Sequence, residues 1–169
     1  MSILDTERLS LRSITLEDAA FIVELLNDPT FLRFVGDKGV RTVDEAREYI
    51  ATGPLASYAR NGFGLWLVEL KASRVPVGIC GLLKREALND VDLGFAFLPR
   101  YRSNGYAYES ASEVLRYARE VLRIKRIVAI TNSDNAGSIR VLEKIGMSFE
   151  QMIRLSADEL EVKLLVSDA

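Results

Sequence analysis

The first half of the chain alternates between strand-like and helix-like patterns of apolar positions. Polar and apolar side chains alternate over residues 8–14, which predicts a half-buried β-strand. A helix is expected over residues 15–26, with a capping pattern at its start and Pro29 shortly after its end. A second capping pattern, at residues 42–45, predicts another helix, which a Gly-Pro pair at 53–54 interrupts and which can resume through residues 55–58.

Three strand-like runs occupy the middle of the chain and predict an antiparallel meander. They cover residues 64–70, 77–83 and 91–98, separated by turn-prone segments long enough for hairpins. The remaining pattern predicts a long amphipathic helix, a buried strand, a second helix and two closing strands, over residues 104–123, 127–131, 136–145, 149–155 and 160–166. This order predicts an α+β or α/β fold with a mixed sheet and helices on its faces.

Length and composition favour one cytoplasmic domain. The chain has 169 residues, of which 49% are apolar, and this suits a single domain over residues 1–169. The only cysteine, Cys80, cannot form an intrachain disulfide and indicates a reducing compartment. We recognise neither a secretion signal nor an apolar run of membrane-spanning length, so we expect a cytoplasmic protein that is not embedded in a membrane.

Charge and residue content exclude several classes of function. The 22 basic and 24 acidic residues give a net charge of −2, without the basic excess of nucleic-acid-binding proteins. The chain has no histidine, which excludes serine–histidine and cysteine–histidine catalysis and removes the commonest zinc ligand. We therefore expect neither a nucleic-acid partner nor a metal site.

The turn at residues 102–107 is the segment best suited to binding a ligand, because the usual nucleotide-binding loops are absent. Its sequence is Arg-Ser-Asn-Gly-Tyr-Ala, and it lies between a predicted strand and the long predicted helix. Free N–H groups at a helix N-terminus favour an anion, and Arg102 can add a bidentate contact to a phosphate. Alternatively, Asn104 and Gly105 only cap the helix.

Four blocks of sequence carry a family resemblance. Residues 102–107 have the pattern Arg-x-x-Gly-x-Ala, and residues 135–147 begin Asn-x-x-Ser and continue to Leu-Glu-Lys-x-Gly. Together with residues 6–12 and 92–99, these blocks resemble the GNAT acetyltransferase superfamily and its RimJ/RimL branch, which contains protein N-terminal acetyltransferases. The resemblance covers nearly the whole chain. It implies a layered α/β/α fold of the α+β class, with a mixed, mostly antiparallel sheet whose central strands splay apart.

The resemblance also implies where acetyl-CoA binds as a co-substrate. Backbone groups of the splayed strand would pair with the pantetheine arm, and the turn at 102–107 would hold the pyrophosphate. Asn135 would hydrogen-bond the pantetheine or the acceptor side. The cofactor-binding residues implied in this way are Phe95, Ala96, Phe97, Arg102, Ser103, Asn104, Gly105, Tyr106, Ala107 and Asn135.

Direct transfer of an acetyl group to an amine requires an acid, a base and oxyanion stabilisation. Many family members place a tyrosine acid seven residues after the asparagine, but that position here is Leu142. Ser138 fills the position of a proposed acid in the RimJ/RimL branch, although water can serve instead and the serine can simply satisfy its own helix. Asp92 lies where related chains carry an acidic residue, and Asp90 can share the role of base. Alternatively, both are solvated charges of a hairpin. A backbone N–H near Phe97 would polarise the thioester carbonyl.

Several other conspicuous residues are expected to have structural roles. Cys80 is interpreted as a core residue, and Glu109 as a surface residue or a partner of Arg116. Trp66 is interpreted as a core or edge-packing residue, with a place in the lining of the acceptor pocket as the alternative. The three tyrosines beside the turn are expected to cover the cofactor or fill the core.

The leading interpretation is an acetyl-CoA-dependent N-acetyltransferase whose acceptor is a protein N-terminus or a small-molecule amine. The alternative is a regulatory module that holds acyl-CoA without turnover, which Leu142 in place of the tyrosine acid favours. In a third interpretation the turn binds another anion and the fold is only analogous. A strand edge near the C-terminus is compatible with a monomer or a homodimer.

Overall fold

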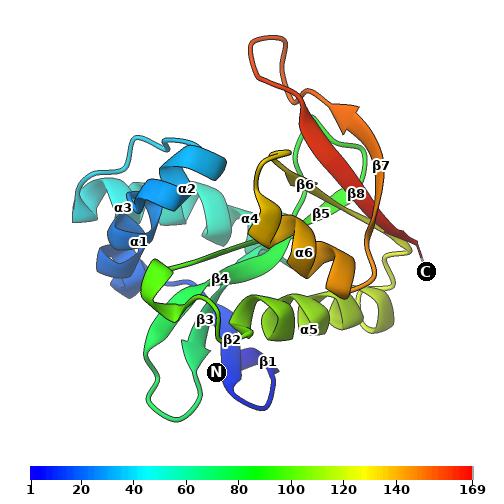
Figure 1. The fold of residues 1–169 in the computed structure, drawn as a ribbon. Coiled ribbons are helices and arrows are strands. Elements are labelled where there is room, and N and C mark those ends of the chain that lie inside the picture. The colour runs from blue at the N-terminus through cyan, green and yellow to red at the C-terminus, as the bar shows by residue number, and fades with distance from the viewer. Residues whose placement is uncertain (169) are drawn as a thin grey trace.

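One eight-stranded sheet organises the protein. The computed structural model describes residues 1–168, and its strands run through the centre of the molecule (Figure 1). Neighbouring strands are antiparallel except for the pair β5 and β6, which is parallel. In spatial order the strands are β1 (Ser2–Asp5), β2 (Leu9–Ser13), β3 (Leu65–Leu70), β4 (Pro76–Leu83), β5 (Val91–Phe97), β6 (Arg126–Thr131), β8 (Val162–Asp168) and β7 (Ser148–Ile153). The predicted α+β fold with a mixed, mostly antiparallel sheet is confirmed.

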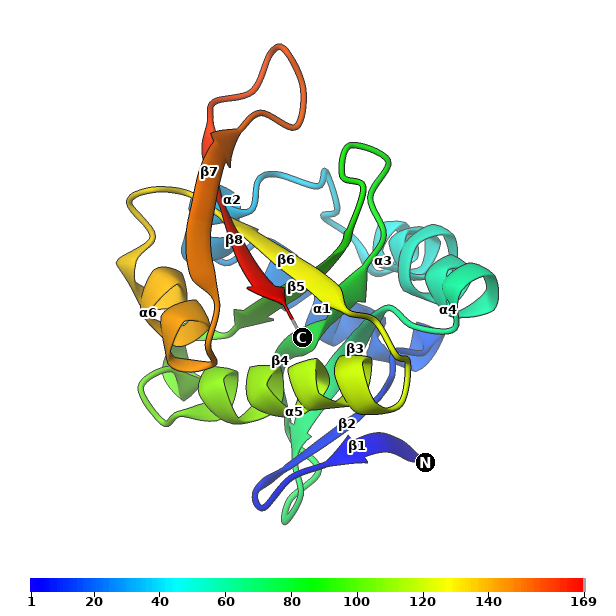
Figure 2. The same cartoon turned by 90° about the vertical axis from the view of Figure 1, so that its right-hand side faces the viewer.

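The helices cover both faces of the sheet (Figures 1 and 2). On one face lie α1 (Ala19–Leu26), α2 (Pro29–Phe34) and α3 (Val43–Ile50), and on the other lie α5 (Tyr106–Glu120) and α6 (Ala136–Lys144). A π-helical turn over Ala51–Leu55 leads from α3 into α4 (Ala56–Asn61), and single 3-10 turns occupy Leu16–Asp18 and Pro99–Tyr101. Within residues 1–168, none of these helices is both long and apolar enough to cross a membrane.

Side chains on the central strands alternate between two hydrophobic cores. On β3, Trp66 and Val68 pack in the core beneath α5, whereas Leu67 packs in the core beneath α1 and α3. Cys80, on β4, is fully buried in the α5 core, and burial raises the pKa of its thiol to about 12. The predictions that Trp66 and Cys80 are core residues are confirmed.

Two elements were not predicted by the hydrophobic pattern. The four-residue strand β1 pairs with β2 at the edge of the sheet and is too short to show a clear period. The first predicted helix does end at Leu26, but a new helix, α2, begins at Pro29. The Asp28 carboxylate accepts a hydrogen bond from the Phe31 N–H (3.2 Å), and Pro29 occupies the first helical position, where its missing N–H costs nothing.

The central strands β5 and β6 part soon after they meet. Their parallel pairing is limited to Val91 and Asp92 of β5 opposite Ile127 and Val128 of β6. Beyond Asp92, β5 stays paired with β4 and β6 stays paired with β8, so both strands continue while the space between them opens. The expected splay of the central strands is therefore present.

A glycine on β4 lets two strands approach closely, and this gives a test of the fold. A Cβ at Gly81 would lie 2.1 Å from the Gly64 carbonyl oxygen and 2.8 Å from the Leu65 Cα, both backbone atoms that cannot turn aside. We expect Gly81→Ala to lower the free energy of unfolding by about 1–3 kcal/mol, measured by urea denaturation.

The matched control is Gly94→Ala, on the residue that faces Gly81 across the β4–β5 pair. A Cβ at Gly94 would make only ordinary contacts, 3.5 Å to Leu83 Cδ1 and 3.8 Å to Leu65 Cδ2. The control should change the free energy of unfolding by less than about 1 kcal/mol, and equal losses for both variants would contradict the steric argument.

Candidate active site

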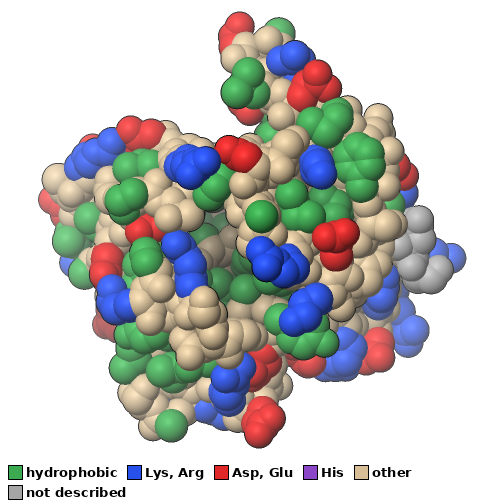
Figure 3. Space-filling model, in the orientation of Figure 1, with side chains coloured by type: hydrophobic (Ala, Val, Ile, Leu, Met, Phe, Trp, Pro, Cys, Tyr) green, Lys and Arg blue, Asp and Glu red, His purple; other side chains and the backbone are tan. Residues whose placement is uncertain are grey.

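An open cavity of about 550 Å³ lies where β5 and β6 part. Its walls come from α2, the end of β5, the turn before α5 and the exposed side of α6. Figure 3 shows it as a hollow in the face of the molecule, with Lys and Arg side chains at its rim. It is lined by most of the residues proposed from sequence, namely Phe95, Ala96, Phe97, Arg102, Ser103, Gly105, Tyr106, Ala107, Asn135 and Ser138.

The end of β5 presents an unpaired strand edge to this cavity. The Leu98 N–H donates to the Val77 carbonyl on β4 (3.1 Å), so the alternation of an antiparallel ladder turns the backbone groups of Phe95 and Phe97 away from β4. The Phe97 carbonyl accepts a hydrogen bond from the Arg102 guanidinium (2.8 Å), which agrees with this orientation. An extended ligand laid along β5 would therefore meet backbone donors and acceptors spaced as in a sheet.

The turn before α5 exposes the positive end of that helix. Ser103 and Gly105 have left-handed backbone conformations, with φ of 65° and 82°, and Gly105 is the N-cap residue. Because glycine has no side chain, it leaves the first N–H groups of α5 without a side-chain cap. Asn104 does not line the cavity, since its amide donates back to the carbonyls of Tyr101 and Arg102 (3.0 and 3.2 Å) and braces the turn. The arrangement is suited to an anion.

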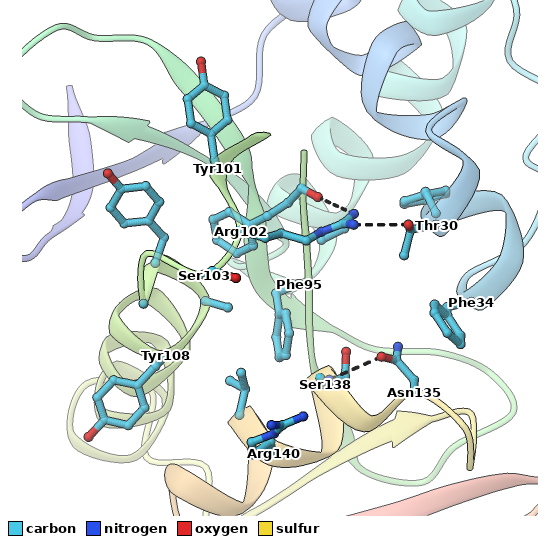
Figure 4. A pocket seen from close by; sticks show the side chains of 18 of the residues that line it. Thr30, Phe34, Phe95, Tyr101, Arg102, Ser103, Tyr108, Asn135, Ser138 and Arg140 are labelled. Atoms are coloured by element: carbon cyan, nitrogen blue, oxygen red, sulfur yellow. Dashed lines mark hydrogen bonds between the residues drawn. The ribbon is translucent and has the colours of Figure 1, made fainter. Parts of the chain in front are cut away.

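The Arg102 side chain connects this turn to α2. Its guanidinium donates to the Thr30 hydroxyl (3.1 Å), as Figure 4 shows. It also donates to the Asp28 carboxylate (3.1 Å) and to the Phe97 carbonyl. Asp28 is 7% exposed and also caps α2 through the Phe31 N–H. Arg102 therefore lines the cavity, as predicted. Its guanidinium, however, is hydrogen-bonded to protein groups, whereas the sequence analysis expected it to contact a phosphate.

The N-terminus of α6 forms the opposite wall. The Asn135 side-chain oxygen accepts a hydrogen bond from the Ser138 N–H (3.3 Å) and so caps the helix. In Figure 4 the Ser138 hydroxyl lies on the cavity side of α6, and no protein group in residues 1–168 is hydrogen-bonded to it. Leu142, at the position for which the resemblance implied a tyrosine acid, is 2% exposed and packs in the core.

Two contacts join α2 to the loop between β6 and α6. The Arg33 guanidinium lies 3.1 Å from the Asp134 carboxylate, and the Asn132 side chain donates to the Phe34 carbonyl (3.2 Å). Sequence patterns did not predict the contribution of α2, whose Thr30, Phe34 and neighbours line the cavity. The sequence signal that could have predicted α2 is Asp28 followed by Pro29, because an aspartate cap with proline at the first helical position is typical of a helix start.

Asp92 lies apart from the cavity, at the last hydrogen-bonded step between β5 and β6. It is 1% exposed, so it is not a solvated charge of a hairpin. Its Oδ2 atom pairs with the Arg85 guanidinium (3.2 Å), whereas Oδ1 has no partner in the described part of the chain. Burial raises the pKa of Asp92, against the lowering effect of Arg85. Asp90 is paired with Arg126 (3.1 Å).

Glu109 has a different partner from the one expected. Arg116 pairs with Glu113 and Glu120 on its own helix. Glu109 instead accepts hydrogen bonds from the Arg8 guanidinium (2.8 Å) and from Thr6 (2.5 Å), which join α5 to the segment between β1 and β2. Arg8 and Glu109 are so far apart in the sequence that no local sequence pattern predicts their pairing.

Comparison with known proteins identifies a family and a shared fold. The acetyltransferase (GNAT) domain family matches residues 8–148. The uncharacterized N-acetyltransferase YoaA of Bacillus subtilis (strain 168) is 29% identical over 153 residues, which cover 90% of this chain and 86% of that protein.

Two solved structures share the fold at lower identity. RimL, a ribosomal L7/L12 alpha-N-protein acetyltransferase in complex with coenzyme A, has a TM-score of 0.83 at 18% identity, covering 99% of this chain and 98% of that chain. A spermidine N-acetyltransferase from Vibrio cholerae, in complex with CoA and spermine, has a TM-score of 0.79 at 17% identity and covers 96% of each chain.

The buried carboxyl of Asp92 predicts a pH dependence of stability. A raised pKa means that the folded protein keeps this proton to higher pH than the unfolded chain, so stability falls as the pH rises above the usual value of 3.8 through the folded pKa. Asp92→Asn removes this loss. We expect the free energy of unfolding of the variant, minus that of the wild type, to grow between about pH 4 and pH 7 in urea titrations. A constant difference, or one that shrinks, would contradict the burial argument.

Proposed function

Because this chain belongs to the GNAT acetyltransferase family, we propose that it transfers an acetyl group from acetyl-CoA directly to a primary amine. The observation that carries the proposal is the juxtaposition, in one cavity, of an unpaired β5 edge and an uncapped α5 N-terminus. A thioester cofactor with an amide-containing arm and a pyrophosphate has groups that match both. CoA is present in the related RimL and spermidine N-acetyltransferase structures, which supports this choice.

The residues of the cavity divide the binding of acetyl-CoA between them. Backbone groups of Phe95 and Phe97 bind the amides of the pantetheine arm as a neighbouring strand would. N–H groups of the turn and of the first residues of α5 bind the pyrophosphate, and Asn135, which also lines the cavity, hydrogen-bonds the pantetheine or the acceptor. The Arg102 guanidinium contacts Asp28 and Thr30. Arg102 therefore supports pyrophosphate binding indirectly, by holding the turn in place.

The chemistry is a displacement at the thioester carbonyl. The amine nitrogen forms a bond to the carbonyl carbon, the carbon–sulfur bond breaks, the amine gives up a proton and the thiolate takes one. A backbone N–H of β5 near Phe97 stabilises the oxyanion. Ser138, whose hydroxyl lies on the cavity side of α6, protonates the thiolate directly or through water. Asp92, the base proposed from the sequence, is 1% exposed and lies outside the cavity, so the amine proton passes to water in the cavity and not to this carboxyl.

The acceptor is a protein N-terminus or a small-molecule amine. The named activities of two structural neighbours represent one of each kind, an alpha-N-protein acetyltransferase and a spermidine N-acetyltransferase. The test is release of the CoA thiol from acetyl-CoA, followed against pooled N-terminal peptides, polyamines and amino acids, with the acetylated product identified by mass spectrometry. Amine-dependent thiol release supports the proposal, and its absence with every acceptor would sink it.

One observation favours a second candidate, a module that holds acyl-CoA without turnover. Leu142 is buried and apolar where many relatives place a tyrosine acid, so this wall of the cavity has no phenolic proton donor. Under this alternative, calorimetric titration would show tight binding of acetyl-CoA, and no acceptor would yield an acetylated product.

The backbone conformation at Gly105 gives a test of the anion site. With φ of 82°, this position disfavours a β-branched residue, and the resulting shift would misalign the N–H groups at the start of α5. We expect Gly105→Val to weaken acetyl-CoA binding about tenfold or more in calorimetric titrations.

Gly62→Val is the matched control, because Gly62 has nearly the same φ, 78°, and ends α4 away from the cavity. Both variants should lose stability to a similar extent, but only Gly105→Val should lose affinity. Equal affinity of the two variants for acetyl-CoA would argue that the turn does not bind the cofactor.

The proposed role of Ser138 predicts an effect on turnover rather than on binding. We expect Ser138→Ala to lower kcat about a hundredfold and to leave the Kd for acetyl-CoA nearly unchanged. Ser112→Ala, on α5 and outside the main cavity, serves as the control for the loss of a hydroxyl. A kcat equal to that of the wild type would assign thiolate protonation to water.

A further inference from the structure

Two basic side chains of α6 line the cavity without an acidic partner. Arg140 and Lys144 are four residues apart, so they project from the same side of the helix. Neither forms an ion pair with any residue in 1–168, and the one recorded contact of the Lys144 ammonium is with the Tyr108 ring, 5.4 Å from its centroid. In Figure 4, Arg140 lies at the α6 side of the cavity, between Ser138 and Tyr108.

The other cations near the cavity are already paired. Arg102 contacts Asp28, and Arg33 of α2 contacts Asp134. A second hollow of about 300 Å³ adjoins the main cavity through Tyr108 and Lys144, but its Arg116 is held by two glutamates. The Arg119 side chain, which also lines this second hollow, donates to the Ser167 hydroxyl. Among the cations of residues 1–168 that line the main cavity, only Arg140 and Lys144 of α6 therefore lack an acidic partner.

This charge is separate from the anion site at the turn. The N–H groups before and within the first turn of α5 are sufficient for one anionic group, and they belong to a different element from Arg140 and Lys144. The cavity thus has places for two anionic groups, one bound by backbone dipoles and one by full charges. CoA carries two such groups, a pyrophosphate and a 3′-phosphate on its ribose, and the latter has about two negative charges at neutral pH.

We propose that Arg140 and Lys144 bind the 3′-phosphate of the cofactor and make the enzyme select CoA over its 3′-dephospho form. The assignment rests on the proposed function, because it takes acetyl-CoA as the ligand of the cavity. The Lys144 ammonium lies beside the Tyr108 ring, a contact that leaves its N–H donors available to a phosphate. Arg140 supplies the forked donors that suit phosphate oxygens.

The experiment measures the affinity of the wild type and of the variants Arg140→Gln and Lys144→Gln for CoA and for 3′-dephospho-CoA by calorimetry. Each variant is expected to weaken CoA binding about three- to tenfold while changing 3′-dephospho-CoA binding by less than about twofold. The wild type should bind CoA more tightly than 3′-dephospho-CoA, by a factor close to the combined effect of the two variants on CoA affinity. This difference in affinity should shrink at high salt.

Lys125→Gln is the control, because Lys125 is an exposed cation before β6 that does not line the cavity. It should leave both affinities unchanged. The dephospho form keeps the pyrophosphate, so equal weakening of both ligands by the α6 variants would place their charges on the pyrophosphate and overturn the assignment. Unchanged CoA binding in both variants would overturn it as well. If the wild type bound neither form, the proposed function itself would fail.

Discussion

Backbone hydrogen bonds between β5 and β6 stop after two residue pairs, and the rest of the structure accommodates the gap that this leaves. Unpaired N–H and C=O groups inside a protein are costly unless water or a ligand satisfies them. The gap therefore has to remain open to solvent or be filled by something that offers backbone-like groups. The turn before α5 and the first turn of α6 border the same space, so the break in the sheet also decides which helix ends become available for binding.

Polar side-chain contacts connect the elements that border the opening between β5 and β6. Arg102 joins the turn before α5 to α2, and the Arg33–Asp134 and Asn132–Phe34 contacts join α2 to the loop after β6. A six-residue helix such as α2 has little stability of its own. Its position is therefore set by these polar contacts together with the burial of Phe31, and the shape of one cavity wall depends on them.

The sequence predicted the parts of this arrangement that have a local cause. Alternating strands, the amphipathic α5 and the glycine at the start of that helix are written in short-range patterns, and the family resemblance placed them around a cofactor. The contribution of α2, the occupation of Arg102 by Asp28 and the pairing of Glu109 with Arg8 depend on residues more than 70 positions apart. Asp92 illustrates the same limit, because its burial follows from the packing around β5 and not from the hairpin sequence beside it.

The position of Cys80 has a consequence for how the reaction can be followed. The thiol is fully buried on β4 and its pKa is raised to about 12, so it remains protonated and out of reach of disulfide reagents while the protein is folded. It is also the only cysteine of the chain. In the thiol-release assay of the proposed transfer from acetyl-CoA, thiol-reactive dyes will therefore report free coenzyme alone. Any delayed colour from the protein will mark unfolded molecules, so that activity and structural integrity come from a single trace.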